Sequence, residues 1–263
     1  ILANNRVVAN NQLISDDEGN YTIDMDGFEK LAQKRENTMF ILCNPHNPTG
    51  RIFNDDELRQ MAKICRENKV VIVADEIHGD LIRKDKKFTP IAKLAEDESN
   101  IVTCTAINKT FNTAGLHASA IVTSNADLKS AFRKSLGMSM PTPFTYNAVI
   151  AAYNESEDWL EQIKDYFDKT FDWVLDFLSK NMPRVKCVRS EGTYVLWMDF
   201  RGYGISAEEI RKRIYNQANV VLESGKLYDP DLGDGFERIC LSSPLSIVQE
   251  AFKRIAKAFE DLD

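Results

Sequence analysis

The sequence predicts an α/β fold in which a mostly parallel, doubly wound sheet is followed by a smaller α+β carboxy-terminal domain. Two observations support this prediction. In the first half of the chain, short and continuous apolar segments alternate with amphipathic helical segments, which is typical of a parallel sheet covered by helices on both faces. After Pro183 the pattern changes to short strand-like segments with antiparallel character, which indicates a second unit.

Three apolar segments of the first half are predicted to be strands of one sheet, with helices between them. The helix before the first strand has Asp26 as its expected cap. The helix after that strand begins at Asn54, because Asn54 followed by Glu57 is a capping-box variant. The predicted strands cover residues 39–43, 70–74 and 101–105. The predicted helices cover residues 28–35, the segment that begins at Asn54, and residues 91–95. The second of these helices has Leu58, Met61, Ala62 and Cys65 on one face.

The second half is predicted to begin with one more strand of this sheet and a long helical region. Between residues 144 and 181 apolar side chains recur at every third or fourth position, which predicts helix with one buried face. These side chains are Trp159, Ile163, Phe167, Phe171, Val174 and Leu178. The remaining predicted elements are the strands 118–123, 185–188, 193–200, 220–222 and 237–241, the helix 127–136, a helix capped by Ser206 and a helix that begins at Leu245. The predicted domains are 1–143 for a partial large domain, 144–177 for an interdomain helix and 178–263 for the small domain.

The composition favours a soluble protein that binds small molecules. With 33 basic and 40 acidic residues the net charge is −7, and no basic face for a nucleic-acid backbone is evident. No apolar run approaches the ~20 residues that cross a bilayer. The five cysteines lack metal-site spacing and lie mostly in apolar segments, so we expect reduced core residues, no metal and a cytoplasmic location.

Polar residues gather where three predicted strands end. In an open parallel sheet, the loops at the carboxyl ends of the strands form the crevice that binds ligands. Asp75 follows one strand directly and could stabilise a proton on the nitrogen of a bound aromatic ring; a helix cap or a salt-bridge partner is the alternative. The neighbouring Glu76 faces the opposite side, so a hydrolase with two paired carboxylates is disfavoured.

Lys109 and Asn47 lie in two of these loops. Lys109 sits between an apolar strand and the apolar stretch 111–116, so its stem is expected to be partly desolvated. Desolvation favours the neutral amine, which is a nucleophile for carbonyl groups, whereas the alternative is a solvated surface lysine. Asn47 precedes Pro48 and could donate to a ring oxygen or form an Asx turn.

Two histidines and one arginine complete the candidate residues. His78 and His117 could each donate to an oxygen or a phosphate of a ligand, or be ordinary polar groups, and their separation does not resemble metal spacing. Arg238 lies in a predicted strand. Because a guanidinium fork fits a carboxylate with two hydrogen bonds, Arg238 could bind a substrate carboxylate, and a structural ion pair is the alternative.

Together these segments resemble the fold-type I pyridoxal-phosphate enzymes, the class I/II aminotransferase superfamily, along nearly the whole chain. The motifs are Asn44-Pro45-His46-Asn47-Pro48-Thr49-Gly50, then Asp75-Glu76-Ile77-His78, then Lys109-Thr110-Phe111-Asn112 with Ala114-Gly115-Leu116. The histidines of the first two motifs, and the asparagine after Phe111, look most like the MalY/PatB branch of cystathionine beta-lyases.

This resemblance implies pyridoxal 5'-phosphate as the cofactor, a small amino-acid substrate and a homodimer with shared active sites. The implied roles are Lys109 as the lysine that holds the cofactor as a Schiff base, Asp75 on the pyridine nitrogen, Asn47 and His78 near the ring hydroxyl, His117 in place of the family's phosphate-binding basic residue, and Arg238 on the substrate carboxylate.

The chain departs from the family pattern in three places. The family usually has serine before the lysine and a basic residue eight positions after it, where this chain has Asn108 and His117. Neutral histidine is a weaker partner for an anion than arginine. The segment from Arg238 to Pro244 lacks the asparagine that is common in the family. Upstream residues that supply the first strands, a phosphate-binding helix start and a stacking aromatic are expected to be lost, cleaved or never encoded.

The expected function is that of a pyridoxal-phosphate-dependent carbon–sulfur beta-lyase that acts on cystathionine or related cysteine conjugates. In this mechanism Lys109 removes the α proton of the substrate as general base. A class I/II aminotransferase shares every step up to the carbanion and is the alternative enzyme. A non-catalytic fragment or regulatory relative of the fold is the alternative of another class.

Overall fold

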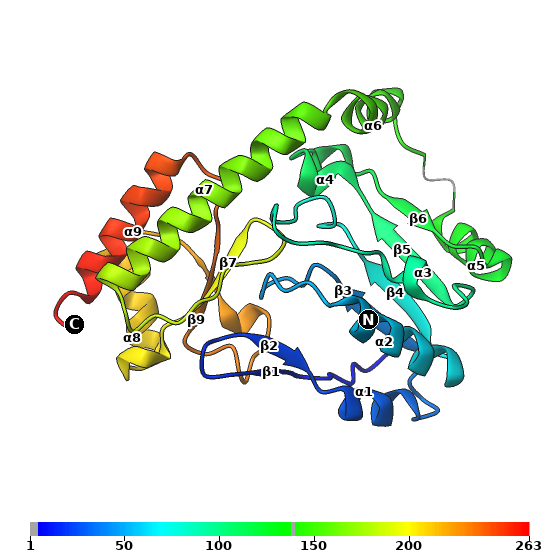
Figure 1. The fold of residues 1–263 in the computed structure, drawn as a ribbon, viewed down its shortest axis with the longest axis horizontal. Helices are drawn as coiled ribbons and strands as arrows, with labels where there is room; N and C mark the ends of the chain where they lie inside the picture. The colour runs from blue at the N-terminus through cyan, green and yellow to red at the C-terminus, as the bar shows by residue number, and fades with distance from the viewer. Residues whose placement is uncertain (1–4, 138–139, 263) are drawn as a thin grey trace.

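A four-stranded sheet organises the first half of the molecule (Figure 1). The computed structural model describes residues 5–137 and 140–262. The strand order is β3-β4-β5-β6, in which β3, β4 and β5 are parallel and β6 runs antiparallel to β5, so the predicted mostly parallel sheet is confirmed. The bounds are Met39–Cys43 for β3, Val71–Asp75 for β4, Ile101–Thr105 for β5 and Ala120–Val122 for β6.

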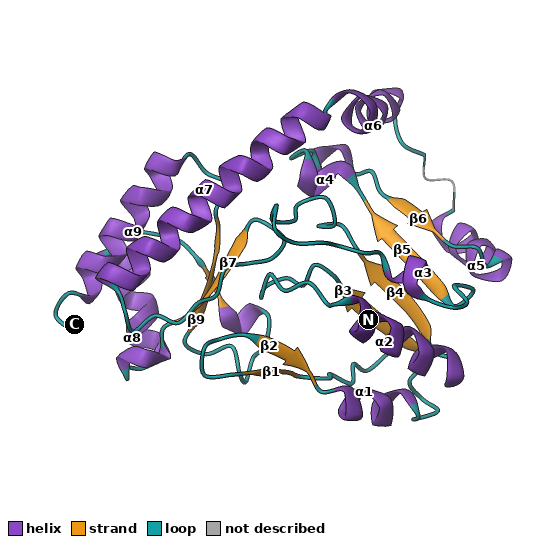
Figure 2. Cartoon of the chain, viewed as in Figure 1, coloured by secondary structure: helices purple, strands orange, loops and turns teal. Residues whose placement is uncertain are grey.

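Helices α1, α2 and α3 lie beside this sheet and pack against one of its faces (Figure 2). Their bounds are Met25–Ala32, Asp55–Glu67 and Ile91–Leu94. Their buried side chains join Leu42, Ile72 and Ala74 in the first hydrophobic core. Met39 and Ile41 alternate with Leu42 along the strand pattern and therefore belong to the opposite face of β3, where they are 59% and 51% exposed. The apolar character of β3 thus extends to a face that stays open within the described residues.

Side-chain caps explain where the first two helices begin. Asn54 accepts the backbone N–H of Glu57, and the Glu57 carboxylate accepts the backbone N–H of Asn54, both at 2.9 Å, so the predicted capping box is confirmed. The expected cap Asp26 is wrong. Asp24 caps α1 by accepting the N–H of Gly27 at 2.9 Å, because Asp24 has the extended backbone of a cap and Asp26 already lies in the first turn.

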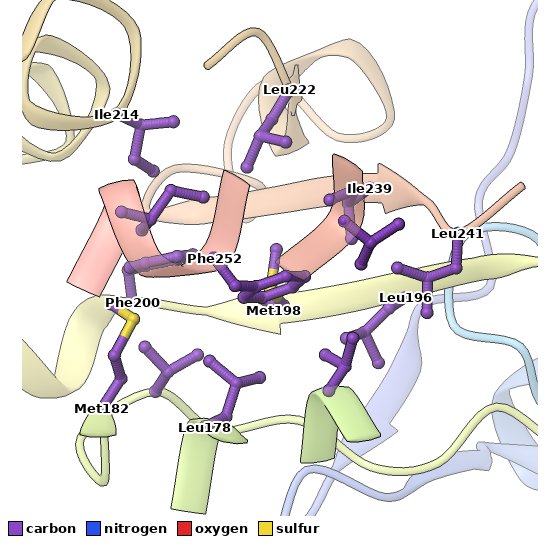
Figure 3. Packing of buried hydrophobic residues seen from close by; sticks show 14 of the residues in the cluster. Leu178, Met182, Leu196, Met198, Phe200, Ile214, Leu222, Ile239, Leu241 and Phe252 are labelled. Carbon is purple, nitrogen blue, oxygen red and sulfur yellow. The ribbon is translucent and has the colours of Figure 1, made fainter. Parts of the chain in front are cut away.

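The second half contains an antiparallel sheet with the order β7-β9-β8, against which α7, α8 and α9 pack, whereas α5 and α6 lie away from it on the side of the large sheet (Figure 1). The predicted apolar stripe of α7 is confirmed from Phe167 to Leu178, which are buried, whereas Trp159 near its start is 43% exposed. Figure 3 shows how Leu178 packs with Leu196, Met198 and Phe252 in the second hydrophobic core. The bounds are Ala126–Leu136 for α5, Pro143–Glu155 for α6, Glu157–Asn181 for α7, Val195–Asp199 for β7, Ala207–Arg211 for α8, Glu223–Ser224 for β8, Phe236–Cys240 for β9 and Leu245–Phe259 for α9.

Two predicted strands of the second half are wrong. Residues 220–222 do not form a strand: Val221 is 88% exposed, and β8 begins one residue later, where Glu223 pairs with Arg238 of β9. Residues 185–188 make a single bridge, between Lys186 and Asp199. Apolar content marked these segments, but the available partner strand decides where pairing occurs. The predicted domain boundaries stay a prediction.

A short hairpin near the start of the chain contacts the second half. Its strands β1 and β2 cover Leu13–Ser15 and Tyr21–Ile23. The Asp16 carboxylate accepts the backbone N–H of Asn20 at 2.8 Å and closes the turn. The Tyr21 hydroxyl accepts a hydrogen bond of 3.0 Å from the indole N–H of Trp197 on β7. The hairpin therefore joins the two halves from the side of the small sheet.

The cysteines are all free thiols, as expected. Cys65 is a core residue, as expected for the cysteines, whereas Cys240 is exposed at the end of β9, the central strand of the small sheet, so the expectation is wrong for this residue. None of the helices within residues 5–137 and 140–262 is long and apolar enough to cross a membrane. Over the same residues, no cluster of histidine, cysteine and acidic side chains has the arrangement of a metal site.

Candidate active site

Three parallel strands end side by side and direct their following loops toward the second half of the molecule (Figure 1). Cys43 at the end of β3 is the register partner of Asp75 at the end of β4, and Asp75 is the partner of Cys104 on β5. The candidate residues Asn47, His78 and Lys109 follow these three strand ends. The sheet therefore brings three distant segments to one edge, as the parallel topology predicts.

The loop after β3 is held in one conformation by its own contacts. Buried Asn44 donates its backbone N–H to the carbonyl of Asp75 at 3.0 Å and accepts the N–H of Phe53 at 3.1 Å. The peptide bonds before Pro45 and Pro48 are cis. Gly50 has a φ of +72°, and a Cβ atom there would lie 2.3 Å from the side chain of Ser190, so only glycine fits.

Asn47 projects from this loop and contacts the small sheet. Its Oδ1 accepts a hydrogen bond of 2.7 Å from Nη1 of Arg238 on β9, in place of a local Asx turn. The Nε group of Arg238 donates to Oε2 of Glu223, Nη2 forms an ion pair with the same oxygen, and the guanidinium carbon lies 5.0 Å from the centroid of the Tyr228 ring. Arg238 is thus partly buried, as predicted, and the ion pair weighed as its alternative is present as well.

His78 is buried between the two halves. Its ring lies edge-to-face with Tyr194, with 5.6 Å between the ring centroids. Burial, followed by the charges of Lys109 and Arg238, lowers the pKa of His78 to about 4. The ring is therefore neutral near pH 7. Its Nδ1 atom is buried and has no hydrogen-bond partner among the described residues.

Lys109 lies on α4 (Ile107–Thr110), a single turn after β5. Ile107 and Thr110 form the buried side of that turn, and Thr110 Oγ1 donates to Asp80 Oδ2 at 2.9 Å. Lys109 lies on the other side and is exposed, so the expected desolvation of its stem is wrong for the described chain. Its positive charge is one of the lesser causes that lower the pKa of His78, after burial.

The two adjacent carboxylates of β4 face different environments, as the alternation of a strand requires. Asp75 is half-buried on the side of the half-buried Cys43 and Cys104, and its Oδ1 accepts only a long bond of 3.4 Å from the Ile77 N–H. Glu76 is buried in the first half and accepts the N–H of Ile91 at 3.0 Å. Burial raises the pKa of Glu76 to about 7. Of the two, Asp75 is the one available to a ligand.

His117 follows a short 3₁₀ turn that contacts the helical turn of Lys109. It caps the 3₁₀ turn Ala114–Leu116 in a left-handed conformation with φ of +49° and is exposed. Its only resolved contact within the described chain is the backbone bond of 3.2 Å to the carbonyl of Ala114. The structure therefore joins Asn47 to Arg238 and places Asp75, His78 and Lys109 at or after the same sheet edge, and the roles of all these residues and of His117 stay predictions.

The sequence from residue 11 to 255 matches the family model of aminotransferase class I and II. This chain belongs to that family. The match covers both halves of the molecule, so the sheet edge and the small sheet are parts of one family fold. The fold class predicted from the motifs is confirmed.

Known relatives of this aminotransferase-family chain include lyases. Cystathionine beta-lyase PatB of Bacillus subtilis is 38% identical over 97% of this chain and 66% of that protein. Protein MalY of Escherichia coli is 27% identical over 89% of this chain and 60% of that protein. The structure of cystalysin from Treponema denticola, which contains a pyridoxal 5'-phosphate cofactor, matches with a TM-score of 0.95 and 34% identity over 100% of this chain and 67% of that chain. The predicted resemblance to the MalY/PatB branch is confirmed, and the chain spans about two thirds of the length of these proteins.

Sequence reasoning missed three side chains of this aminotransferase-family site. Glu223, Tyr228 and Tyr194 all contact or surround Arg238 and His78. The available signal was the register of the small sheet, because Glu223 lies directly opposite Arg238. The strand was predicted to end at residue 222, so the pairing of Glu223 with Arg238 was not predicted. Tyr228 lies outside regular strands and has no periodic pattern that could reveal it.

Proposed function

We propose that this chain carries the cofactor site and the catalytic lysine of a pyridoxal-phosphate-dependent carbon–sulfur beta-lyase that acts on cystathionine or related cysteine conjugates. The observation that supports it is the hydrogen bond by which Asn47 meets Arg238 across the two halves, at the sheet edge after which His78 and Lys109 also follow. The names of the relatives PatB and cystalysin support the same assignment.

The residues present fit pyridoxal phosphate. His78 has a buried Nδ1 atom without a partner in the described chain, which suits it to the hydroxyl of the pyridine ring. Asn47 uses its Oδ1 for Arg238, and its amide NH₂ can donate to the same ring oxygen. Asp75 would hold the ring nitrogen, Lys109 the aldehyde carbon, and His117 the phosphate.

The chain's own groups supply binding and proton transfer. When bound, pyridoxal phosphate supplies an electron sink for the bond that breaks at the substrate's α carbon. Arg238 binds the α-carboxylate through its guanidinium fork. Nζ of Lys109 takes the α proton, and the thiolate leaves the β carbon with the electron pair of the C–S bond. With one water, the conjugate yields a thiol, pyruvate and ammonia.

An aminotransferase is the second candidate, because the family description names that reaction and the same residues serve until the α proton has moved. The two reactions differ in their need for a co-substrate. Pyruvate release from cystathionine without any keto acid identifies the lyase, whereas strict dependence on a keto-acid acceptor identifies the aminotransferase.

The first experiment measures cofactor binding by colour. Purified chain incubated with pyridoxal phosphate should turn yellow, and Lys109→Ala should abolish the absorbance band. Lys93→Ala, which changes an exposed lysine of α3, is the matched control and should keep it. A colourless wild-type chain that releases no pyruvate contradicts the proposal and favours the non-catalytic alternative.

We also propose a cytoplasmic homodimer in which the domains divide at residues 143 and 177. The small-molecule substrate is an amino acid, as the family match indicates. The mass of the native protein in solution tests the dimer. Limited proteolysis tests the boundary at residue 143, because the boundary at residue 177 lies inside the helix α7. Cleavage that spares the segment around residue 143 contradicts the division.

A further inference from the structure

Arg238 has most of its hydrogen bonds committed before any ligand arrives. A guanidinium has five N–H groups. The Nε group donates to Oε2 of Glu223, one N–H of Nη2 lies in ion-pair contact with the same oxygen, and one N–H of Nη1 donates to Oδ1 of Asn47 at 2.7 Å. The other two, one on each terminal nitrogen, make no hydrogen bond within the described part of the chain. These two remain for a carboxylate.

The register of the small sheet imposes the contact with Glu223. Glu223 on β8 lies directly opposite Arg238 on β9, so the two side chains are cross-strand neighbours on one face. The Arg238 side chain is 11% exposed, whereas that of Glu223 is 46% exposed. The arginine is therefore the buried partner, and the glutamate approaches it from the solvent side.

Tyr228 holds the same carboxylate and the same guanidinium. Its hydroxyl donates to Oε2 of Glu223 at 3.2 Å, and its ring lies against the guanidinium plane. Burial is the largest cause that raises the pKa of Tyr228 to about 12, so the hydroxyl keeps its proton and remains a donor. Glu223 Oε2 thus accepts two hydrogen bonds and takes part in the ion pair with Nη2, and these contacts oppose its displacement by a second carboxylate.

We propose that Glu223 is a positioning residue of the substrate-carboxylate subsite, which fixes the Nε edge of Arg238 so that its two remaining N–H groups face the substrate. The inference rests on the proposed function, because it takes Arg238 as the residue that binds the α-carboxylate. Glu223 itself touches neither substrate nor cofactor in this scheme.

Whether KM rises or falls when the Glu223 carboxylate is removed decides whether Glu223 positions Arg238 or competes with the substrate for it. A carboxylate that merely occupied the guanidinium would compete with the substrate, and its removal would lower KM. A carboxylate that orients the guanidinium lowers KM when present, and its removal raises KM while kcat changes little. The two hydrogen bonds and the ion pair on Oε2 favour the second case.

The kinetic test compares a graded set of variants in the complete chain loaded with cofactor. Glu223→Ala should raise the KM for cystathionine by about tenfold with kcat within about twofold, since an orienting hydrogen bond to a charged group is lost. Glu223→Gln keeps an oxygen acceptor and should raise KM by about threefold. Tyr228→Phe keeps the ring and should raise KM by about twofold. Glu250→Ala, which removes an exposed ion pair with Arg254 on α9, is the control and should leave KM unchanged.

A second readout needs no activity. In ¹⁵N-edited spectra the Nε–H signal of Arg238, assigned by its absence in Arg238→Lys, should exchange slowly with water in the wild type and rapidly in Glu223→Ala. An unchanged or lower KM in Glu223→Ala overturns the proposal, as does an unchanged exchange rate. Wild-type protein that releases no pyruvate contradicts the proposed function and removes the subsite with it, whereas active wild type with an unaffected Glu223→Ala contradicts only this inference.

Discussion

Asn47 and Arg238 are separated by 191 positions in the chain, and a hydrogen bond of 2.7 Å joins their side chains across the space between the two halves. One belongs to the loop after a parallel strand and the other to an antiparallel strand of the small sheet. The site therefore exists only when both halves are folded and in contact. Stability and ligand binding should be coupled through this pair.

A double-mutant cycle measures that coupling. Asn47→Ala and Arg238→Ala should each destabilise the chain, and the double variant should recover a coupling free energy of roughly 1 kcal/mol, because the bond involves a charged donor and is partly buried. Urea unfolding of the four proteins gives the value. The exposed pair Asp176 and Lys180 on α7 is the control and should couple by less than about 0.5 kcal/mol. Equal coupling in both cycles would contradict the importance of the contact.

The titration of His78 reports whether Lys109 reaches the site. The pKa of His78 is lowered to about 4, mainly by burial and then by Lys109 and Arg238. Its ring signals in NMR spectra should stay constant between about pH 5.5 and 8, where an unperturbed histidine titrates. Lys109→Met removes a positive charge and should raise the pKa of His78. Lys129→Met, at an exposed position of α5, should not.

The lowered pKa of His78 also determines how the free energy of unfolding should change with pH. Because the folded pKa of His78 lies below its unfolded value of 6.5, its contribution to the free energy of unfolding is complete above pH 6.5 and is lost as the pH falls toward 4. His78→Gln should therefore weaken the loss of stability between those values. Urea unfolding in acid buffers checks it, and an unchanged slope would count against a buried neutral His78.

For Glu237 we expect the opposite pH dependence of its contribution to the free energy of unfolding. It is buried on β9 and accepts a hydrogen bond of 3.0 Å from the Tyr215 hydroxyl, and burial raises its pKa to about 7 from 4.5. The folded state thus binds the proton more tightly, and the contribution of Glu237 is complete below pH 4.5 and lost as the pH rises through 7. Glu237→Gln should flatten the fall in the free energy of unfolding between pH 5 and pH 8. Exposed Glu250→Gln should leave the slope as it is.

Two apolar substitutions in the second half should differ in their effect on the free energy of unfolding, because one residue is buried and the other is exposed. Phe171 is fully buried and packs beneath the guanidinium of Arg83 at 4.9 Å, so Phe171→Ala should cost about 3–5 kcal/mol of unfolding free energy. Val221 is 88% exposed, so Val221→Ala should change it by less than about 0.5 kcal/mol. Thermal and urea unfolding measure both. A large loss in Val221→Ala would restore the strand that the sequence predicts at residues 220–222.

Local patterns predicted much of the large sheet correctly. The strands 39–43 and 101–105 were predicted with their observed bounds, because each is a continuous apolar run between polar turns. The capping box at Asn54 was also correct, since it depends only on residues three apart. Short-range chemistry therefore sufficed wherever an element is defined by its own residues.

Features that depend on residues distant in the chain could not be predicted from local sequence patterns. β8 covers only Glu223 and Ser224, too short for a periodic signal, and its position follows from pairing with β9. The exposure of Lys109 depends on which side of a single helical turn faces the first half, and motifs carry no such information. Among the candidate residues, the family motifs identified Asn47, His78 and Arg238, whose meeting is observed, whereas Glu223 required the register of the small sheet.

The 25-residue helix α7 connects the lysine turn mechanically to the small sheet. Trp159 near its start lies against Phe111, two residues after Lys109, with 5.5 Å between the ring centroids and 30° between the ring planes, and Phe171 further along lies in the second hydrophobic core. Because one continuous helix carries both contacts, a displacement of the small sheet relative to the large sheet should also displace Trp159 and its contact beside the turn of Lys109.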